Sequence, residues 1–209
     1  MKRNKLLALT FDDGPAETTL KIIAALGRNK ASATFFVNGN CLRKFPEITR
    51  EAARYGNEIG NHTDKHLHLP DHSYVDILQE IQSTTKLITE VTGKRPTLMR
   101  PPFGEYNNKV KRAAETENLA LLNWSIDPRD WESDDALTTR RRILEEIADG
   151  DVVLCHDRMA STAELMITFI TELGERGYEL VTVTELFRRK KVQFLAGRLY
   201  LCPGQKPQD

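Results

Sequence analysis

The sequence predicts an α/β fold with a mostly parallel sheet, and two observations lead to this prediction. Short runs of apolar and β-branched residues alternate with longer amphipathic stretches along nearly the whole chain. Seven such runs occur in 209 residues, so one run and the stretch after it take about 30 residues, the size of a strand plus a helix. Strands that alternate with helices form parallel sheets, and the pattern alone leaves open a doubly wound sheet or a barrel.

The seven predicted strands are short and mostly apolar. They are expected at residues 6–11, 33–37, 58–61, 97–99, 119–125, 151–155 and 179–183. The clearest helices between them are expected at residues 18–28, 73–92 and 162–176, because apolar residues recur there at helical spacing. Gly27, Gly93 and Gly177 fall near the predicted helix ends, where glycine commonly follows the last turn.

The segment after Arg189 has a different pattern. Two short apolar runs, at residues 192–195 and 198–201, flank Ala196 and Gly197, which predicts a small β-hairpin. Residues 203–209 are expected to be loose. We therefore expect one catalytic domain over residues 1–190 and a C-terminal extension over residues 191–209.

Composition and charge exclude several classes of protein. Forty percent of the residues are hydrophobic and 29% are charged, which is typical of a globular protein rather than of a disordered chain. Thirty basic residues balance 30 acidic residues, so bulk charge gives no reason to expect a nucleic acid or a membrane surface as partner. No apolar run approaches the roughly 20 residues that a membrane-spanning helix needs.

The three cysteines, Cys41, Cys155 and Cys202, cannot all pair with one another, and no two of them form a C-x-x-C motif. A disulfide scaffold and a cysteine-based zinc site are therefore not expected. Cys155 lies within an apolar run, where a buried and unreactive thiol is expected.

The N-terminus has some features of an export signal. Lys2, Arg3 and Lys5 resemble its basic region, but the apolar run that follows, residues 6–9, is shorter than the roughly 7–15 residues required. We therefore interpret this run as the first strand. The interpretation leaves open a cytosolic protein or one whose export signal has been removed.

The residues able to perform chemistry lie just after predicted strands. They are Asp12 and Asp13 after the first strand, His62 and His66 after the third, Arg100 after the fourth, Asp127, Asp130 and Trp131 after the fifth, and His156 and Asp157 after the sixth. The carboxyl ends of parallel strands meet at one edge, where active sites of barrels and open sheets are built. The sequence therefore predicts that these side chains converge on one site.

The spacing of His62 and His66 suggests a metal site. On one helical turn, side chains four residues apart share a face, so both imidazoles could reach one ion. A carboxylate from Asp12 or Asp13 would complete a set of three protein ligands, which leaves positions for water and substrate, as in catalytic sites. The alternative is a pair of surface histidines. His68 and His72 lie in a polar loop and are expected to be exposed.

Further candidates belong to the later segments. Arg100 precedes two prolines that restrict the backbone, so its guanidinium could be held against a carboxylate. Trp131 follows Asp130 in a predicted loop, where it could form a wall on which a sugar ring stacks. Trp124 lies within the fifth predicted strand and is expected in the core. His156 is a candidate because it converges with the other groups.

Five motifs resemble those of one family in the same order. They are Thr10-Phe11-Asp12-Asp13-Gly14-Pro15, His62-Thr63-x-x-His66, Arg100-Pro101-Pro102-Phe103-Gly104, Asp127-x-x-Asp130-Trp131 and Leu154-x-His156. Over residues 6–187 the chain resembles the polysaccharide deacetylases, that is carbohydrate esterase family 4, which contain the NodB-homology domain. The resemblance implies a distorted (β/α) barrel of about seven parallel strands. It also implies a divalent metal, Zn²⁺ in the first place, with Co²⁺ or Ni²⁺ as alternatives.

The resemblance assigns the metal ligands and the base. It implies that Asp13, His62 and His66 bind the metal. Asp12 would be the general base that activates a water molecule, and Arg100 would pair with Asp12 and orient it. Such a metal polarises the carbonyl and acidifies its bound water, which amide or ester hydrolysis requires.

The remaining site residues follow from the same resemblance. His156 would be the general acid, and Asp130 would orient it. Leu154 would line the pocket for the acetyl methyl group. The backbone N–H of Phe103 would help to hold the oxyanion, and the common tyrosine of the family is not needed for a backbone donor. Trp131 remains the expected sugar-stacking wall.

The implied activity is that of a metal-dependent hydrolase acting on carbon–nitrogen bonds other than peptide bonds. The expected substrate is an acetylated glycan with N-acetylglucosamine units, as in peptidoglycan or chitin, and the alternative is O-deacetylation of acetylxylan. The protein is expected to act as a monomer. Two other classes are compatible with part of the pattern, a non-haem iron oxygenase and a carbohydrate-binding module on an inactive scaffold. An oxygenase does not need Asp12 and His156, and an inactive scaffold would be expected to lack a ligand or the base.

Overall fold

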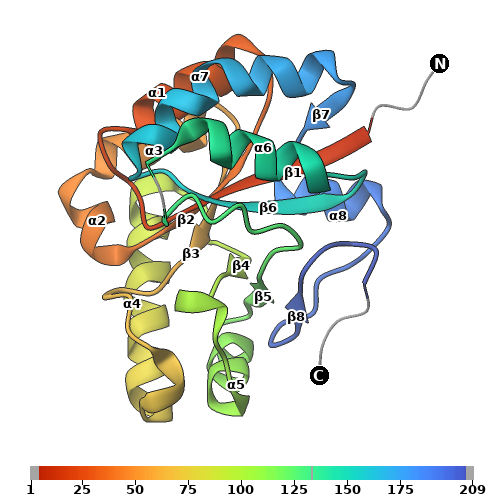
Figure 1. Ribbon diagram of the computed structural model, residues 1–209. Coiled ribbons are helices and arrows are strands. Elements are labelled where there is room, and N and C mark those ends of the chain that lie inside the picture. The colour runs from red at the N-terminus through yellow and green to blue at the C-terminus, as the bar shows by residue number, and fades with distance from the viewer. Residues whose placement is uncertain (1–4, 133, 206–209) are drawn as a thin grey trace.

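A computed structural model describes residues 5–132 and 134–205 (Figure 1). The elements in chain order are β1 (Lys5–Asp12), α1 (Thr19–Arg28), β2 (Thr34–Val37), α2 (Gly39–Lys44), α3 (Pro46–Arg54), β3 (Glu58–Asn61), the 3-10 turn η1 (Leu69–Asp71), α4 (Tyr74–Thr92), β4 (Leu98–Met99), the 3-10 turn η2 (Pro102–Gly104), α5 (Asn108–Thr116), β5 (Ala120–Leu122), α6 (Ala136–Glu146), β6 (Asp151–His156), α7 (Ala160–Glu175), β7 (Tyr178–Leu180), α8 (Val183–Arg189) and β8 (Leu199–Tyr200). All seven predicted strands and the three predicted helices are present, with ends that differ by a few residues.

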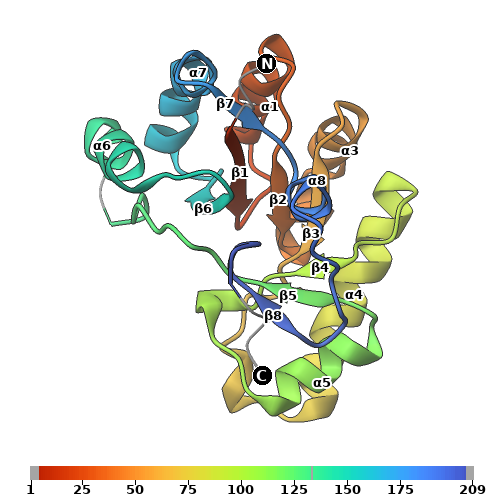
Figure 2. The ribbon, with the colours of Figure 1, turned by 90° about the vertical axis from the view of Figure 1, so that its right-hand side faces the viewer.

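The strands form one curled sheet in which every strand pairing is parallel. Their order is β6-β1-β2-β3-β4-β5-β8, and β7 pairs with the start of β1. Figure 2 shows the sheet curving from β6 and β1 through β3 to β5 and β8, with the large helices outside it. A single bridge between Ile126 and Val153 links the segment after β5 to β6. The prediction of a distorted (β/α) barrel is therefore confirmed.

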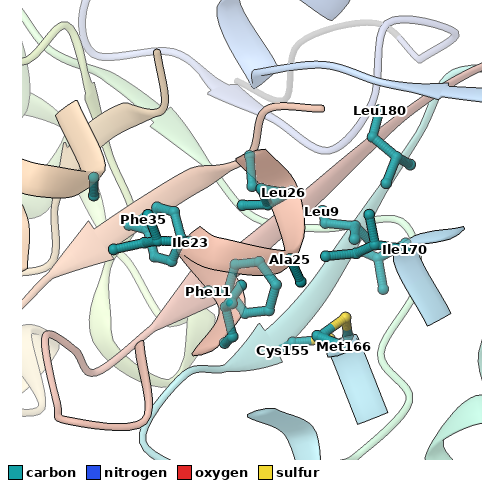
Figure 3. Packing of buried hydrophobic residues seen from close by; sticks show 14 of the residues in the cluster. Leu9, Phe11, Ile23, Ala25, Leu26, Phe35, Cys155, Met166, Ile170 and Leu180 are labelled. Atoms are coloured by element: carbon teal, nitrogen blue, oxygen red, sulfur yellow. The ribbon is translucent and has the colours of Figure 1, made fainter. Parts of the chain in front are cut away.

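The alternation of side chains along β1 explains how the barrel carries polar groups inside. Leu7, Leu9 and Phe11 belong to the core between the sheet and the outer helices. Figure 3 shows Leu9 and Phe11 in this core near Ile170 of α7. Successive side chains of a strand point to opposite faces, so Thr10 and Asp12 face the other side. This face becomes polar only at the carboxyl end of the strand, where the candidate site lies.

The C-terminal segment differs from the prediction. The expected hairpin is absent among the described residues of this segment, because β8 pairs in parallel with β5, with Leu199 opposite Leu121 and Tyr200 opposite Leu122. Tyr200 packs edge-on against Phe194, with ring centroids 5.0 Å apart. Val192 and Phe194 pack against the core cluster that includes Tyr200, so residues 192–195 do not pair with residues 198–201. The expected loose tail lies partly outside the described residues, at 206–209.

The burial of Cys155 agrees with the sequence prediction. Cys41, Cys155 and Cys202 are free thiols. Cys155 is fully buried in β6, and burial raises the pKa of its thiol well above the usual value, which makes it unreactive. Among residues 5–132 and 134–205, no helix has the length and apolar character needed to cross a membrane.

Candidate active site

The predicted residues meet in one pocket at the carboxyl ends of the strands. The pocket has a volume of about 340 Å³ and is lined by Asp12, Asp13, His62, His66, Phe103, Gly104, Trp124, Asp127, Trp131, Leu154, His156 and Arg158. Arg100 and Asp130 are fully buried behind this lining. The ten residues with an expected role in catalysis, substrate binding or metal binding are therefore brought together, eight at the surface of the pocket and two directly behind it. Asp157 was also expected to converge on this site, but it is buried outside the lining of the pocket and accepts a hydrogen bond from Oγ1 of Thr19.

The sheet itself places Asp12. It is the last residue of β1 and lies opposite His156, the last residue of β6, in the parallel pairing of the two strands. Asp12 is only 3% exposed, and its Oδ1 accepts a hydrogen bond of 2.8 Å from Nη1 of Arg100. The other carboxylate oxygen, Oδ2, lies 3.9 Å from Nε2 of His62. One oxygen of Asp12 is thus held, and the other faces the histidine pair.

Arg100 is held as firmly as the carboxylate that it pairs with. Its Nε donates to the carbonyl of Leu122 at 3.0 Å, and its Nη2 donates to the carbonyl of Asn123 at 2.8 Å. Its Nη1 also donates to Oγ1 of Thr10 at 2.8 Å, and the guanidinium lies 4.3 Å from the ring centroid of Phe36. A buried charge is tolerated only when it is paired and hydrogen-bonded, and these contacts satisfy that condition.

Three further side chains form a candidate metal site. Oδ1 of Asp13 lies 3.5 Å from Nε2 of His62 and 3.2 Å from Nε2 of His66. A tetrahedral ion with bonds of about 2.0–2.2 Å separates its ligand atoms by about 3.3–3.6 Å. One ligand atom from each of the three residues lies within 4.8 Å of the others. The spacing and the mixture of imidazole and carboxylate therefore fit one divalent ion.

The hydrogen bond of His62 also suits a metal ligand. Its Nδ1 lies 2.7 Å from the carbonyl oxygen of Arg100. A carbonyl can only accept, so Nδ1 of the neutral ring carries the proton and Nε2 presents its lone pair to the site. A second hydrogen bond of this kind commonly fixes the orientation of metal-binding histidines.

The histidine pair is not on a helical turn, which corrects the sequence interpretation. The segment after β3 is a loop in which Thr63 has φ 63° and His66 has φ 57°. Non-glycine residues are uncommon in this left-handed region. The two imidazoles therefore converge through a specific loop conformation and not through helical spacing, with their ring centroids 5.0 Å apart.

The protonation states of two of the three candidate ligands, Asp13 and His66, also favour a cation. Burial by itself would raise the pKa of Asp13, but a hydrogen bond to His62 and the charges of His62, His66 and His156 hold it well below its usual range. Burial, followed by the charge of His62, lowers the pKa of His66. An ionised carboxylate and a neutral imidazole are the forms that bind metal, so both shifts suit a ligand role.

Asp130 and His156 form the second pair of the site. Oδ1 of Asp130 lies 2.7 Å from Nδ1 of His156, and Oδ2 accepts hydrogen bonds from the His156 backbone N–H at 2.8 Å and from Oγ1 of Thr162 at 2.6 Å. Burial by itself would lower the pKa of His156. The hydrogen bond to Asp130 and its charge, together with the charges of Asp12 and Asp13, raise that pKa above its usual value.

The remaining predicted residues form the walls of the pocket. Leu154 is two residues before His156 on β6, so both side chains lie on the same face of the strand. Phe103 has φ 60°, and its ring packs edge-on against His66 with centroids 4.7 Å apart. Trp131 lies in the loop before α6 and is 51% exposed. An exposed aromatic ring and a buried aliphatic side chain therefore border the polar groups.

The sequence analysis missed two residues of the pocket. Trp124 was expected in the core, but β5 ends at Leu122, so Trp124 lies beyond the strand and lines the pocket. Arg158 was not considered, and its Nε lies 3.1 Å from Oδ2 of Asp13. The sequence feature that could have indicated Arg158 is its position two residues after His156, just beyond the end of a predicted strand. His68, expected to be exposed, is partly covered and lies 2.9 Å from a carboxylate oxygen of Glu105 through its Nε2.

Comparisons with known proteins agree with this geometry. The family described as polysaccharide deacetylase matches residues 1–121. Peptidoglycan-N-acetylglucosamine deacetylase PgdA of Listeria monocytogenes is 37% identical over 190 residues, covering 90% of this chain and 40% of PgdA. Peptidoglycan deacetylase PdaC from Bacillus subtilis has a solved structure with a TM-score of 0.87 and 36% identity, covering 90% of this chain and 93% of that one.

A third similarity involves a different kind of protein. The Xyl-CE4 domain of a multidomain xylanase from the hindgut metagenome of Trinervitermes trinervoides has a TM-score of 0.90 and 27% identity, covering 98% of this chain and all of that one. The chain spans only about 40% of the length of PgdA. The extent of these matches nevertheless shows that this chain belongs to the polysaccharide deacetylase family.

Proposed function

We propose that this protein is a metal-dependent hydrolase that removes acetyl groups from N-acetylglucosamine units of a peptidoglycan or chitin-type glycan. The observation that carries the proposal is the presence in one pocket of three kinds of group. These are a candidate metal trio, a carboxylate paired with arginine, and an imidazole paired with a carboxylate. PgdA and PdaC, which are named as peptidoglycan deacetylases, support this choice of substrate class.

Asp13, His62 and His66 would hold one divalent ion, with Zn²⁺ as the first candidate and Co²⁺ or Ni²⁺ as alternatives. When bound, such an ion lowers the pKa of a water molecule and polarises a carbonyl oxygen. Arg158 would restrain the outer oxygen of Asp13, because its Nε lies 3.1 Å from Oδ2. The inner oxygen, Oδ1, is then left to face the two imidazoles.

Asp12 would act as the general base. Its Oδ1 is held by Arg100, so Oδ2 is the atom that would accept a proton from the attacking water. A general base must be held in place and must still leave one oxygen free to take a proton, and the two oxygens of Asp12 divide these tasks. The hydrogen bond from the buried guanidinium of Arg100 to Oδ1 fixes the direction in which Oδ2 points.

His156 would act as the general acid. Its Nδ1 faces Asp130, so the proton on Nε2 would pass to the leaving nitrogen of the acetamido group. The raised pKa of His156 favours the protonated form that an acid requires. Asp130 would hold the ring in place and stabilise its charge, while its own carboxylate remains fixed by Thr162.

The walls would position the acetyl group and the sugar. Leu154 would contact the acetyl methyl group, and the backbone N–H of Phe103 would donate to the developing oxyanion. Trp131 would stack on a sugar ring. The same set of groups would serve for an acetate ester, and the likeness to a xylanase-associated domain makes O-deacetylation of acetylxylan the second candidate.

The test is a panel of acetate-release assays. Metal-free protein would be assayed on chitin oligomers, peptidoglycan and acetylxylan, alone and after addition of Zn²⁺, Co²⁺ or Ni²⁺. We expect release from an N-acetylated glycan only after a metal is added, and His66→Ala should abolish it while His72→Ala should not. Full release by protein from which metal is verifiably absent would contradict the proposal, and release only from acetylxylan would favour the second candidate.

A further inference from the structure

The loop that carries His62 and His66 is held from two sides. On one side, the first backbone N–H groups of α2 donate to it, Gly39 to the carbonyl of Thr63 and Asn40 to that of Asp64, each at 3.0 Å. These bonds fix two carbonyl groups of the loop. The backbone N–H groups of the loop between His62 and His66 need other acceptors.

Helix α4, which runs beside β3 in Figure 1, supplies the other side. Oε2 of Glu80 accepts hydrogen bonds from the backbone N–H groups of Asp64, at 3.0 Å, and Lys65, at 2.7 Å. The preceding N–H, that of Thr63, donates to Oδ1 of Asn61 at 2.8 Å. Three successive N–H groups before His66 are therefore taken by side-chain oxygens.

Asn61 is itself tied to the same helix. Its Nδ2 donates to the carbonyl of Ile81 and to Oγ1 of Thr85, both at 2.9 Å. Successive N–H groups in a turn form a concave site for an anion. Here the anion belongs to the chain, because the carboxylate of Glu80, which is 6% exposed, occupies that position.

The loop needs such support because of its backbone. Thr63 and His66 both have positive φ, a conformation that costs free energy for residues other than glycine and persists only where neighbouring contacts impose it. Hydrogen bonds to an ionised acceptor are roughly twice as strong as those between neutral groups. Glu80 lies next to the strained part of the loop and supplies two bonds of this stronger kind.

We infer that Glu80 is a positioning residue for the candidate metal site: by binding the N–H groups of Asp64 and Lys65, it holds His66 where its imidazole faces Asp13. The inference rests on the proposed metal-binding role of Asp13, His62 and His66. Glu80 touches none of these three side chains in the hydrogen bonds described. Its effect is expected on the affinity for the metal and on the order of the loop.

The test uses two substitutions of Glu80 and measures metal affinity on the metal-free full chain. Glu80→Ala removes the oxygen that accepts both hydrogen bonds, and we expect the dissociation constant for Zn²⁺ to rise about 10–100-fold, as for other losses of groups that orient metal ligands. Glu80→Gln keeps an acceptor but removes the charge, so the rise should be smaller, about threefold or more. Hydrogen exchange of the Asp64 and Lys65 amides should accelerate in both variants.

Two controls separate positioning from general stability. Ile88→Ala removes a buried side chain from the same helix and should lower the unfolding temperature without changing the Zn²⁺ affinity. Glu90→Ala removes an exposed carboxylate from that helix and should change neither quantity. An Ile88→Ala variant that loses as much metal affinity as Glu80→Ala would overturn the inference.

The outcomes distinguish this inference from the proposed function. If the unaltered protein binds Zn²⁺ and releases acetate but both Glu80 variants bind Zn²⁺ within twofold of it, only the positioning role fails. If the unaltered protein binds no divalent metal, the proposed function fails as well. Should Glu80→Ala not fold, Glu80→Gln decides alone, and an unchanged Zn²⁺ affinity in that variant overturns the inference.

Discussion

The two halves of the site are built in different ways. Asp12 and His156, the strand-borne pair, end neighbouring strands and lie opposite each other in the parallel pairing of β1 and β6. His62 and His66, the loop-borne pair, lie in a segment with two left-handed residues and are held by contacts from α2 and α4. The sheet places the first pair, whereas side-chain and helix-end contacts place the second.

This difference suggests how each half should respond to change. The strand-borne pair shares the stability of the core, since the strand that bears Asp12 is buried from Leu6 onward. The loop-borne pair depends on local contacts that can be lost without unfolding the barrel. Changes around the strand-borne pair should therefore alter chemistry at constant metal content, and changes around the loop-borne pair should alter metal content first.

The largest expected effect compares two adjacent residues, Asp12, which is expected to act in the chemistry, and Asp13, which is expected to bind the metal. Asp12→Asn keeps size and polarity but cannot accept a proton from water, so activity should fall about 10²–10⁴-fold while metal affinity stays near normal. Asp13→Ala removes a candidate ligand and should lower metal affinity and activity together. Metal titration by calorimetry beside acetate release would check both variants.

Two outcomes would alter the interpretation of these adjacent carboxylates. If Asp12→Asn loses the metal and Asp13→Ala keeps it, the two roles are exchanged. If Asp12→Asn keeps full activity, the hydrolytic mechanism fails. Some loss of stability is expected in Asp12→Asn, because the buried guanidinium of Arg100 loses its charged partner at 2.8 Å.

The same contrast explains what the sequence could predict. Short apolar runs placed the strands well enough to put Asp12 and His156 at strand ends, and the parallel pairing followed from the fold class. His62 and His66 were correctly selected, but their four-residue spacing suggested a helical turn. The left-handed backbone at Thr63 has no sequence signature, because the loop is also held by Gly39 and Glu80, which lie far from it in the sequence.

Other errors have related causes. Glu80 lies on α4, 14 residues after His66, so local patterns gave no indication of its contact with the loop. The hairpin predicted near residues 192–201 was wrong, because β8 pairs with the edge of β5 instead. A pattern of apolar runs predicts strands but does not specify which strand each one pairs with. Trp124 was expected in the core because the predicted strand extends to residue 125, three residues beyond the end of β5 at Leu122.

The second prediction sharpens the description of the strand-borne pair. Asp130 raises the pKa of His156, and an acid is active only while protonated, so activity should be lost as pH rises through this raised pKa. Asp130→Asn removes the charge, lowers that pKa, and should move the alkaline limb of kcat/KM to lower pH by roughly one unit or more. The pH profile of acetate release measures this shift.

Thr162→Val is the matched control for that experiment. It removes the hydrogen bond of 2.6 Å to Asp130 but leaves the charge in place. Its alkaline limb should therefore stay close to that of the unaltered protein. An alkaline limb that does not move in Asp130→Asn would show that this carboxylate does not set the proton affinity of His156.

The third prediction concerns the loop-borne pair. In the metal-free protein, burial lowers the pKa of His62, but the charges of Asp12 and Asp13 and the hydrogen bond to Asp13 raise it overall above its usual value. Below that raised pKa, a metal must displace a proton from His62, so affinity should fall about tenfold per pH unit on acidification. Competition titrations with a chromophoric chelator between pH 5.5 and 7.5 would measure it, and a constant affinity would contradict it.

The smallest expected effect lies outside both pairs, at the exposed wall of the pocket. Trp131 is 51% exposed, so replacing it should cost little stability. A stacked aromatic contact is worth about 1 kcal/mol, which corresponds to about a fivefold change in kcat/KM. Trp131→Ala should therefore lower kcat/KM about fivefold on long glycans and much less on a small acetylated reporter, while metal affinity and the pH profile stay unchanged. Equal losses on both substrates would mean that Trp131 acts on the reacting group and not on the sugar chain, and a large fall in the unfolding temperature would identify it as a packing residue.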